Sequence, residues 1–299
     1  MPELPEVETI VRRLRKALPG RTVVRARVLR DNVVRGSKRR FRHAVEGARI
    51  VSVDRRAKFI VLGLDDGRVW LSHLRMSGKW LIETPPAEAR VVRDEASRGA
   101  APRKKRDPLR AELPAYTRAA FELDDGARLL YVDPRTLGEM EVMRGIEWQA
   151  REARLGPEPL EPGFTPELLT ARLATSRRPV KEALLDQTKV AGLGNIYVSE
   201  ALWRAGISPR RRAHHVGPVR ARRLHTAIVA VLSDAIGRSG TSFGSTYLDF
   251  VDANGEAGEF YDFLAVYDRE GEPCHRCGTP IARIVQGQRS TYYCPRCQR

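Results

Sequence analysis

Apolar residues recur at helical spacing near the start of the chain. Four of them share one face of a helix over residues 3–17: Val7, Ile10, Val11 and Leu14. From residue 21 the pattern changes to short runs rich in β-branched residues, which predict strands. These runs cover residues 21–29, 48–56, 58–64, 68–74 and 119–133, with DDG turns at 65–67 and 124–126. The pattern predicts an N-terminal helix followed by an antiparallel β-sandwich.

Helical spacing returns after a proline-rich stretch at residues 156–164. A proline or a capping residue marks the start of each predicted helix. These helices begin at Thr165, Pro179, Asn195 and Pro218, and the last three end near Leu185, Gly206 and Arg238. A loop of small and polar residues at 240–260 then leads into a tail that carries the cysteines.

The changes of pattern divide the chain into parts of an α+β protein. The predicted parts are a β-sandwich domain at 1–150, a linker at 151–163, a helical domain at 164–262 and a cysteine-bearing tail at 263–299. Residues 84–116 are rich in proline and charge and have little to bury, so they are predicted to be a mobile insertion. The run RKKR at 103–106 could meet DNA phosphates, although a solvated charge run is the favoured interpretation.

Composition limits the classes of function. The chain has 299 residues, of which 42% are hydrophobic and 30% charged, as in a globular protein. It has neither an apolar run of membrane-spanning length nor a signal peptide, so a cytoplasmic protein with reduced thiols is expected. The net charge of +16 favours a polyanionic partner. Charge alone leaves a generally basic surface as an equal alternative.

The four cysteines follow the pattern C-x2-C-x16-C-x2-C. They are Cys274, Cys277, Cys294 and Cys297. This spacing is typical of a zinc ribbon, in which four thiolates hold one structural Zn²⁺ and leave no position for water. Two disulfides are the alternative, which the absence of a secretion signal disfavours. His275 is interpreted as a spacer, and Arg283 and Arg289 lie in the hairpin where they could meet phosphate.

The stretch KVAGLGNIYVSEAL, residues 189–202, carries two glycines and Asn195 between two helices. Backbone N–H groups at such a helix start can bind phosphate. An ordinary helix turn with Asn195 as its cap is an alternative that the sequence leaves open.

The opening MPELPEVETI carries Pro2, Pro5 and three glutamates. Helix capping and the helix dipole account for these residues except Pro2. A small second residue permits removal of Met1, which would leave Pro2 as a secondary amine that titrates at about pH 8 or below. Such an amine can attack a sugar C1′ to give an iminium, and Glu3 could supply a proton.

Six motifs stand in order between residues 2 and 297. They are PELPEVET, RRAKFI around Lys58, HLRMSG, DPR-x-x-G, KVAGLGNIY and the four-cysteine ribbon. Together they resemble the formamidopyrimidine-DNA glycosylase family. The PELPE start favours this branch of the superfamily over the endonuclease VIII type.

The resemblance implies a bifunctional DNA glycosylase and AP lyase that excises oxidised purines, such as 8-oxoguanine and formamidopyrimidines, and cleaves the strand by β,δ-elimination. It implies that Pro2 is the Schiff-base nucleophile and Glu3 the acid. Lys58 would act in β-elimination and phosphate contact, and Arg289 in δ-elimination. The resemblance gives further residues DNA-contacting or supporting roles: Glu6, His73, Met76, Tyr116, Arg135, Leu137, Lys181 and Asn195.

The family fold would make the sandwich the catalytic domain, the helical part a helix-two-turn-helix domain and the tail a zinc finger. The loop at 240–260 would cover the flipped base. The implied partner is double-stranded DNA with an oxidised base or an abasic site, bound by a monomer in the bacterial cytoplasm, associated with the nucleoid. No membrane partner is expected.

Three positions depart from the family pattern. Leu137 stands where an aromatic wedge is usual, Tyr116 replaces a histidine, and Ser176 replaces a basic residue. These departures bear on lesion choice and on contact detail, whereas Pro2, Glu3, Lys58 and the four cysteines are intact. Two alternatives to the oxidised-purine enzyme are a non-catalytic DNA-binding protein, which the retained Pro2 and Glu3 disfavour, and a paralogue for oxidised pyrimidines or crosslinked lesions.

Overall fold

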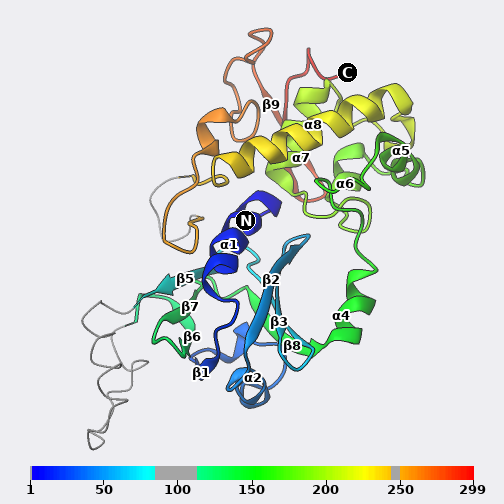
Figure 1. The fold of residues 1–299 in the computed structure, drawn as a ribbon. Coiled ribbons are helices and arrows are strands. Elements are labelled where there is room, and N and C mark those ends of the chain that lie inside the picture. The colour runs from blue at the N-terminus through cyan, green and yellow to red at the C-terminus, as the bar shows by residue number, and fades with distance from the viewer. Residues whose placement is uncertain (1, 85–112, 244–249) are drawn as a thin grey trace, which may run out of the picture.

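Helix α1 (Leu4–Ala17) lies between a β-sheet part and a helical part of the molecule (Figure 1). This computed structural model describes residues 2–84, 113–243 and 250–299. Glu6 reaches back to accept a hydrogen bond from the Glu3 backbone N–H at 2.8 Å, which satisfies one free donor at the helix start. The predicted apolar face of the helix is buried.

Eight of the ten described strands form two four-stranded antiparallel sheets. One sheet has the order β1 (Val23–Val28), β6 (Thr117–Leu123), β7 (Arg128–Val132), β5 (Lys79–Glu83). The other has the order β2 (Ile50–Arg56), β3 (Phe59–Leu64), β4 (Arg68–His73), β8 (Glu139–Arg144). Aromatic side chains, including Trp70, Trp80 and Phe121, are buried in their shared core. The predicted α+β fold with an antiparallel sandwich is confirmed.

Four elements of this part were not predicted from periodicity. They are α2 (Lys38–Val45), β5, β8 and α4 (Gly145–Glu152), and a short 3-10 helix, η1 (Asp31–Val33), precedes α2. Helix α2 buries only Phe41 and Val45 among basic residues, so its apolar stripe is too short to be recognised.

The helical part follows the predicted starts. It contains α5 (Pro166–Ala174), α6 (Val180–Leu185), α7 (Asn195–Ala205), η3 (Ala213–His215), α8 (Pro218–Gly237) and η4 (Phe260–Phe263). The Thr165 hydroxyl accepts from the Leu168 N–H at 3.2 Å, as a helix cap does. Gly206 ends α7 with a φ of 67°, a left-handed conformation that suits glycine.

The tail forms a hairpin of β9 (Ala282–Gln286) and β10 (Arg289–Tyr293). Gly287 and Gln288 have positive φ values of 52° and 60°, as in a two-residue hairpin turn. The Lys181 ammonium on α6 donates to the Ser290 carbonyl at 2.9 Å and to the Thr291 hydroxyl, which holds the hairpin against the helical part.

Two loop predictions include residues outside the description, the insertion for most of its length and the second loop for a short stretch. The insertion predicted at 84–116 is described only at 84 and 113–116, and RKKR at 103–106 lies outside the description. The loop predicted at 240–260 is described except for residues 244–249. Among the helices of the described ranges, none combines the length and apolar character needed to cross a membrane.

Candidate active site at the domain boundary

Three adjoining cavities lie where the sandwich, the helical part and the zinc hairpin meet. A cavity of about 50 Å³ is bordered by Pro2, one of about 290 Å³ by Glu3, and one of about 400 Å³ by Lys58. Met76 borders the first two cavities and Arg289 borders the last two. The structure therefore brings the four predicted catalytic residues to one cleft from distant parts of the chain.

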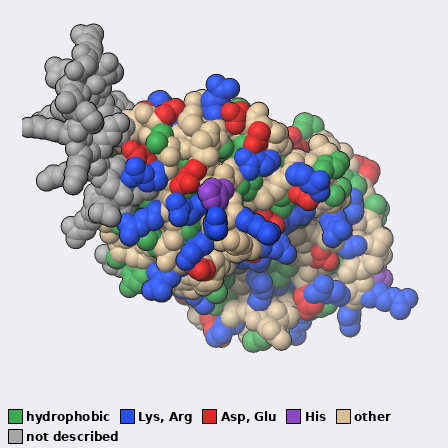
Figure 2. Space-filling model, turned by 90° about the horizontal axis from the view of Figure 1, so that it is seen from below, with side chains coloured by type: hydrophobic (Ala, Val, Ile, Leu, Met, Phe, Trp, Pro, Cys, Tyr) green, Lys and Arg blue, Asp and Glu red, His purple; other side chains and the backbone are tan. Residues whose placement is uncertain are grey.

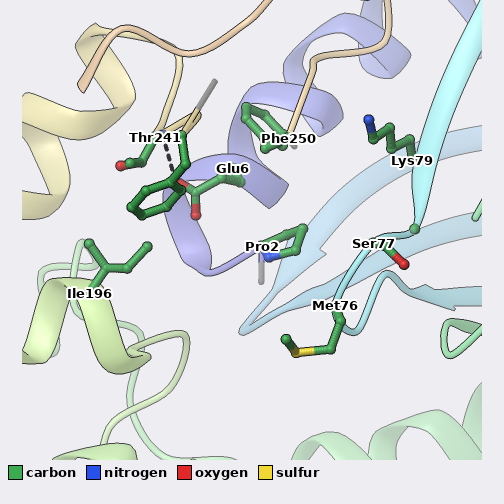
Figure 3. Close-up of a pocket in the computed structure, with 10 residues that line it drawn as sticks. Pro2, Glu6, Met76, Ser77, Lys79, Ile196, Thr241 and Phe250 are labelled. Carbon is green, nitrogen blue, oxygen red and sulfur yellow. Dashed lines mark hydrogen bonds between the residues drawn. The ribbon is translucent and has the colours of Figure 1, made fainter. Parts of the chain in front are cut away.

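Pro2 lies between Glu6 and Met76 in the smallest cavity (Figure 3). Thr241 and Phe250, from the predicted loop at 240–260, border the same cavity. Pro2 itself is buried. The chain start is therefore enclosed by the sandwich on one side and by the described ends of this loop on the other.

Glu3 is held by the start of α7. Its carboxylate accepts from the Ile196 N–H at 2.9 Å and from the Tyr197 N–H at 3.4 Å, and the residue is 1% exposed. The expectation that this turn presents its N–H groups to phosphate is wrong for these two groups, because Glu3 occupies them. The alternative is wrong as well, because Gly194 and not Asn195 is the N-cap.

The two glycines of the GLG turn make room for the chain start. A Cβ atom at Gly194 would lie 2.2 Å from the Glu3 Cδ, and one at Gly192 would lie 2.6 Å from the Leu4 Cδ1. Gly192 also has a φ of +80°, and its carbonyl accepts from the Leu4 N–H at 3.1 Å. Their function in this structure is close backbone approach to α1.

Gly194→Ala is expected to displace the Glu3 carboxylate and to destabilise the protein by about 1–3 kcal/mol through overpacking. Thermal or urea unfolding measures the stability, and the rate of 8-oxoguanine release from a duplex, the step in which the resemblance makes Glu3 the acid, measures the position of Glu3. Gly163→Ala is the matched control, because a Cβ there meets nothing within 4 Å. Equal behaviour of the two variants would contradict this role of Gly194.

Glu6 connects α1 to α7 and to the loop at 240–260. Its carboxyl group accepts from the Tyr197 hydroxyl and from the Glu3 N–H. It also accepts from the Thr241 N–H at 2.9 Å (Figure 3). Burial, and then the charge of Glu3, raise the pKa of Glu6. Burial and the neighbouring Glu6 raise the pKa of Tyr197 well above its usual range. This network fixes the segment that follows Pro2.

Lys58 is the second residue of the tight turn between β2 and β3 and is 7% exposed. Burial lowers the pKa of Lys58, as does the nearby Arg289, whereas Glu3 and Glu6 raise it. Within the described ranges no carboxylate lies within ion-pair distance of its ammonium group. A lysine in this state can exchange a proton nearer to neutral pH than a solvated lysine can.

His73 borders the same cavity as Lys58 and Arg289. Burial, followed by the charges of Arg75 and Lys58, lowers the pKa of His73 to about 3. Its Nδ1 accepts from the Arg75 N–H at 3.0 Å, so the neutral ring carries its proton on Nε2. The ring is therefore a neutral hydrogen-bond donor toward the cavity.

Two predicted DNA-contacting residues make structural contacts here. Lys181 is 0% exposed, and burial with the charge of Arg289 lowers the pKa of Lys181 to about 8. The Asn195 Nδ2 donates to the Ser290 carbonyl at 3.0 Å. Both side chains therefore hold β10, and with it Arg289, next to the cleft. Their contacts to DNA stay predictions.

The two loops with the predicted wedge residues are linked by a residue that sequence reasoning missed. Asp133 is 0% exposed and accepts from the Ser77 hydroxyl at 2.5 Å and from the Gly138 N–H at 2.8 Å. It thereby fixes the spacing between Met76, which is 39% exposed, and Leu137, which is 47% exposed. The leading Asp of the DPR-x-x-G motif was the available signal.

Arg135 and Tyr116 lie at the edge of the same region. Arg135 is exposed, and its N–H donates to the Ser77 hydroxyl at 3.3 Å. Tyr116 has a φ of 64°, and the Arg118 guanidinium lies 5.7 Å from its ring centroid. Both stay predicted DNA contacts.

The sulfur atoms of the four cysteines lie within 4.8 Å of one another, and those of Cys277 and Cys294 are 3.5 Å apart. Sulfurs at about 2.3 Å from one tetrahedral ion would be separated by about 3.8 Å, so the group fits Zn²⁺. The four thiols are free, which excludes the two-disulfide alternative in this structure. One structural zinc is held by these residues.

Basic side chains predominate on the face seen in Figure 2, on both sides of a hollow. The chain carries 53 Lys and Arg against 37 Asp and Glu. A basic face around a hollow suits a polyanion that lies across it.

Three known family domains match successive segments of the chain. The formamidopyrimidine-DNA glycosylase N-terminal domain matches residues 1–140, and the H2TH domain of the same enzyme matches residues 155–246. A zinc finger found in FPG and IleRS matches residues 271–299. The fold and these matches define a DNA repair glycosylase of the helix-two-turn-helix class.

Relatives match over the whole chain. Formamidopyrimidine-DNA glycosylases of Geobacillus kaustophilus and Rhizobium meliloti are 40% and 41% identical, each covering 100% of both proteins. The chain therefore belongs to the formamidopyrimidine-DNA glycosylase family.

Solved structures of proteins from the same family superpose on this chain. MutM in complex with carbocyclic 8-oxo-G containing DNA superposes with a TM-score of 0.82 at 31% identity, with 100% of both chains covered. Lactococcus lactis Fpg with abasic-site DNA gives a TM-score of 0.82 at 31% identity, with 99% of both chains covered. The MutM (Fpg) protein of Thermus thermophilus gives 0.81 at 37% identity, covering 99% of this chain and 98% of that one.

Proposed function

We propose that this protein excises oxidised purines from double-stranded DNA and cleaves the strand at the resulting abasic site. The observation that carries the proposal is the single cleft bordered by Pro2, Glu3, Lys58 and Arg289. A protein that only binds DNA has no need for an enclosed chain start next to a buried lysine. The family membership and the relatives' DNA complexes support the same function.

The first step is attack of the Pro2 amine on C1′ of the damaged nucleotide. The C1′–N bond to the base breaks, and the new N–C1′ bond becomes an iminium as the sugar ring opens. Glu3 lies next to Pro2 in sequence and borders the neighbouring cavity, so it is suited to protonate the opening sugar oxygen. The hydrogen bonds from α7 keep its carboxyl group in place.

The iminium makes the C2′ hydrogen acidic, and its removal expels the 3′ phosphate. Loss of a further proton expels the 5′ phosphate and completes δ-elimination. Lys58 is the proposed proton-transfer group for the first elimination, because its pKa is lowered and it is free of an ion pair among the described residues. Arg289 and the Nε2–H of His73 border the same cavity and would hold the flanking phosphates.

Attack at C1′ requires the damaged nucleotide to leave the base stack, which costs a few kcal/mol. Met76 and Leu137 are exposed apolar side chains on loops tied together by Asp133, so they can enter the vacated space as a pair. Arg135 would lie between them and contact the base of the opposite strand that has lost its pairing partner.

Leu137→Phe is expected to raise discrimination between bases opposite the lesion by about 1 kcal/mol, roughly fivefold, because an aromatic ring stacks on a base better than leucine does. Excision rates on duplexes with 8-oxoguanine opposite each of the four bases measure this. Leu160→Phe, on a half-buried leucine outside the cleft, is the control. An unchanged ratio of rates in Leu137→Phe would refute the wedge role.

Each domain that the sequence predicts would have its own role in this reaction. Residues 1–150 would carry the nucleophile, residues 164–262 would bind DNA and cover the flipped base, and residues 263–299 would supply Arg289. We also propose that the protein acts as a monomer in the cytoplasm, at the nucleoid.

The direct test is cleavage of a duplex that contains one 8-oxoguanine, beside the same duplex with guanine. The proposed function predicts release of 8-oxoguanine and a gap with phosphates at both ends. Binding of the duplex without release of 8-oxoguanine would favour a non-catalytic DNA-binding protein. Preference for a duplex with an oxidised pyrimidine would favour a paralogue for such lesions.

A further inference from the structure

The turn that presents Lys58 is held from outside its own domain. The segment between α4 and α5, residues 153–164, passes from the sandwich to the helical part (Figure 1). We call it the joining segment. It carries Glu158, whose side chain is 10% exposed and faces the end of the β2–β3 hairpin.

Glu158 is bonded to three successive residues, the last two of β2 and the first of that turn. Its Oε1 accepts from the Ala57 N–H at 2.5 Å and from an Arg56 Nη1 at 2.9 Å, and its Oε2 accepts from an Arg55 Nη1 at 2.6 Å. Arg55 is 8% exposed and also donates to Glu8 of α1 at 2.9 Å. A carboxylate that satisfies two guanidinium groups and one amide fixes the turn in a single conformation.

The conformation that Glu158 fixes is an unfavourable one. Ala57 has a φ of 53°, in the left-handed region that residues with a Cβ atom avoid. The turn therefore needs outside contacts to persist, and Lys58 is the next residue. Loss of these contacts would let the backbone before Lys58 relax.

The joining segment is also bonded to the turn that leads to Glu3. The Gly156 N–H donates to the Gln187 carbonyl at 2.8 Å, and the Ala191 N–H donates to the Pro157 carbonyl at 3.0 Å. The carbonyl of the next residue, Gly192, accepts a hydrogen bond from the Leu4 N–H. One short segment thus touches both the Lys58 turn and the turn that receives the chain start.

We infer that Glu158 is a positioning residue for Lys58: it holds the Arg55–Ala57 turn in its strained conformation and so sets the Lys58 ammonium in the cleft bordered by Arg289. This inference rests on the proposed function for its catalytic consequence. The position and protonation of the Lys58 side chain can be measured without any assay of activity.

The test compares Glu158→Gln with Glu152→Gln. Glu152 pairs with Arg56 at 3.2 Å but makes no contact to Ala57 among the described residues, so it controls for loss of a neighbouring carboxylate. Glu158→Gln is expected to slow strand cleavage at a preformed abasic site by about tenfold to a hundredfold, the scale of a small misplacement of a reacting group. Glu152→Gln is expected to cleave at the unmodified rate.

A double-mutant cycle separates positioning from general loss of stability. In a Lys58→Arg background Glu158→Gln should cause no further loss of rate, because its effect passes through Lys58. Equal fold losses in the two backgrounds would overturn the inference. An unmodified rate for Glu158→Gln with Lys58 present would do so too.

A second readout does not depend on activity. Lysines methylated with ¹³C give resonances that titrate with pH, and Lys58→Arg identifies the Lys58 signal. The charged and titratable groups that face Lys58 are Glu3, Glu6, Arg289 and His73, and all stay in place in both variants. The pKa of Lys58 should rise in Glu158→Gln, because burial is its main depressing cause, and should stay unchanged in Glu152→Gln.

A Lys58 titration that is the same in Glu158→Gln as in the unmodified protein would refute the inference. A protein that shows the expected titration but cleaves no DNA would instead refute the proposed function.

Discussion

Protein that keeps Met1 is expected to form no covalent complex with abasic-site DNA and to show no strand cleavage by elimination. With Met1 in place the Pro2 nitrogen belongs to a planar amide, and its lone pair is delocalised into the carbonyl group. An amide nitrogen in this state cannot attack C1′. The expected effect is a complete loss, whereas a substitution of Pro2 by another residue would still leave an amine at the chain start.

The comparison uses one sequence in two forms. Expression with the methionine aminopeptidase inhibited yields the form with Met1, and intact mass measures the share of each form. Borohydride trapping should scale with the processed share. Trapping of the form that keeps Met1 would show that Pro2 is not the nucleophile.

Removal of zinc is expected to abolish DNA binding. The tail buries a small core of its own around Cys274, Cys294 and Tyr292, so metal binding supplies much of its folding free energy, about 10–16 kcal/mol in isolated zinc fingers. Without the ion the hairpin loses its shape, and Arg289 loses its place at the cleft. Metal analysis should give one zinc per chain, and a gel-shift titration after chelation should show binding lost by a factor of roughly 100 or more, the loss of several phosphate contacts.

Cys297→Ser and His275→Ala form a matched pair for this prediction. Cys297 belongs to the four-sulfur cluster, whereas His275 is exposed and lies within the knuckle as a spacer. The cysteine variant should lose zinc and DNA binding, and the histidine variant should keep both. Full DNA binding after removal of the metal would contradict the structural role of the tail.

Local sequence was sufficient for the elements with strong patterns. Helices α7 and α8 were located by their apolar spacing and by the glycine and proline at their ends, and the DDG turns located two strand pairs. Helix α2 was missed because it buries only two side chains. Strand β8 was missed for a related reason, since Met140 is the one residue it fully buries.

Sequence predicted the site residues that lie within motifs but not the residues that hold them in place. The residues that hold the proposed catalytic groups are far from them in sequence: Ile196 lies 193 residues from Glu3, and Glu158 lies 101 residues from Ala57. No periodicity relates such pairs, because only the folded chain brings them together. For the same reason the sequence offers only a phosphate site or an ordinary Asn-capped turn for the GLG stretch, whereas its glycines in fact admit Glu3 and Leu4.

Lys181 is a second case in which the sequence does not reveal the environment of a residue. A lysine in a basic protein is expected at the surface, yet it is buried and bonded to residues more than one hundred positions away. Its neighbours satisfy the ammonium group with a carbonyl and a hydroxyl, which offsets the cost of burial. Sequence identifies the residue but not this environment.

We propose that the chain start is the nucleophile of a DNA glycosylase and lyase. The most direct measurement is borohydride reduction of the protein mixed with a duplex that contains one 8-oxoguanine, followed by proteolysis and mass spectrometry of the DNA-linked peptide. We expect one sugar remnant per chain, bonded to the nitrogen of Pro2 in the N-terminal peptide. A remnant on a lysine such as Lys58, or no linked peptide at all, would contradict it.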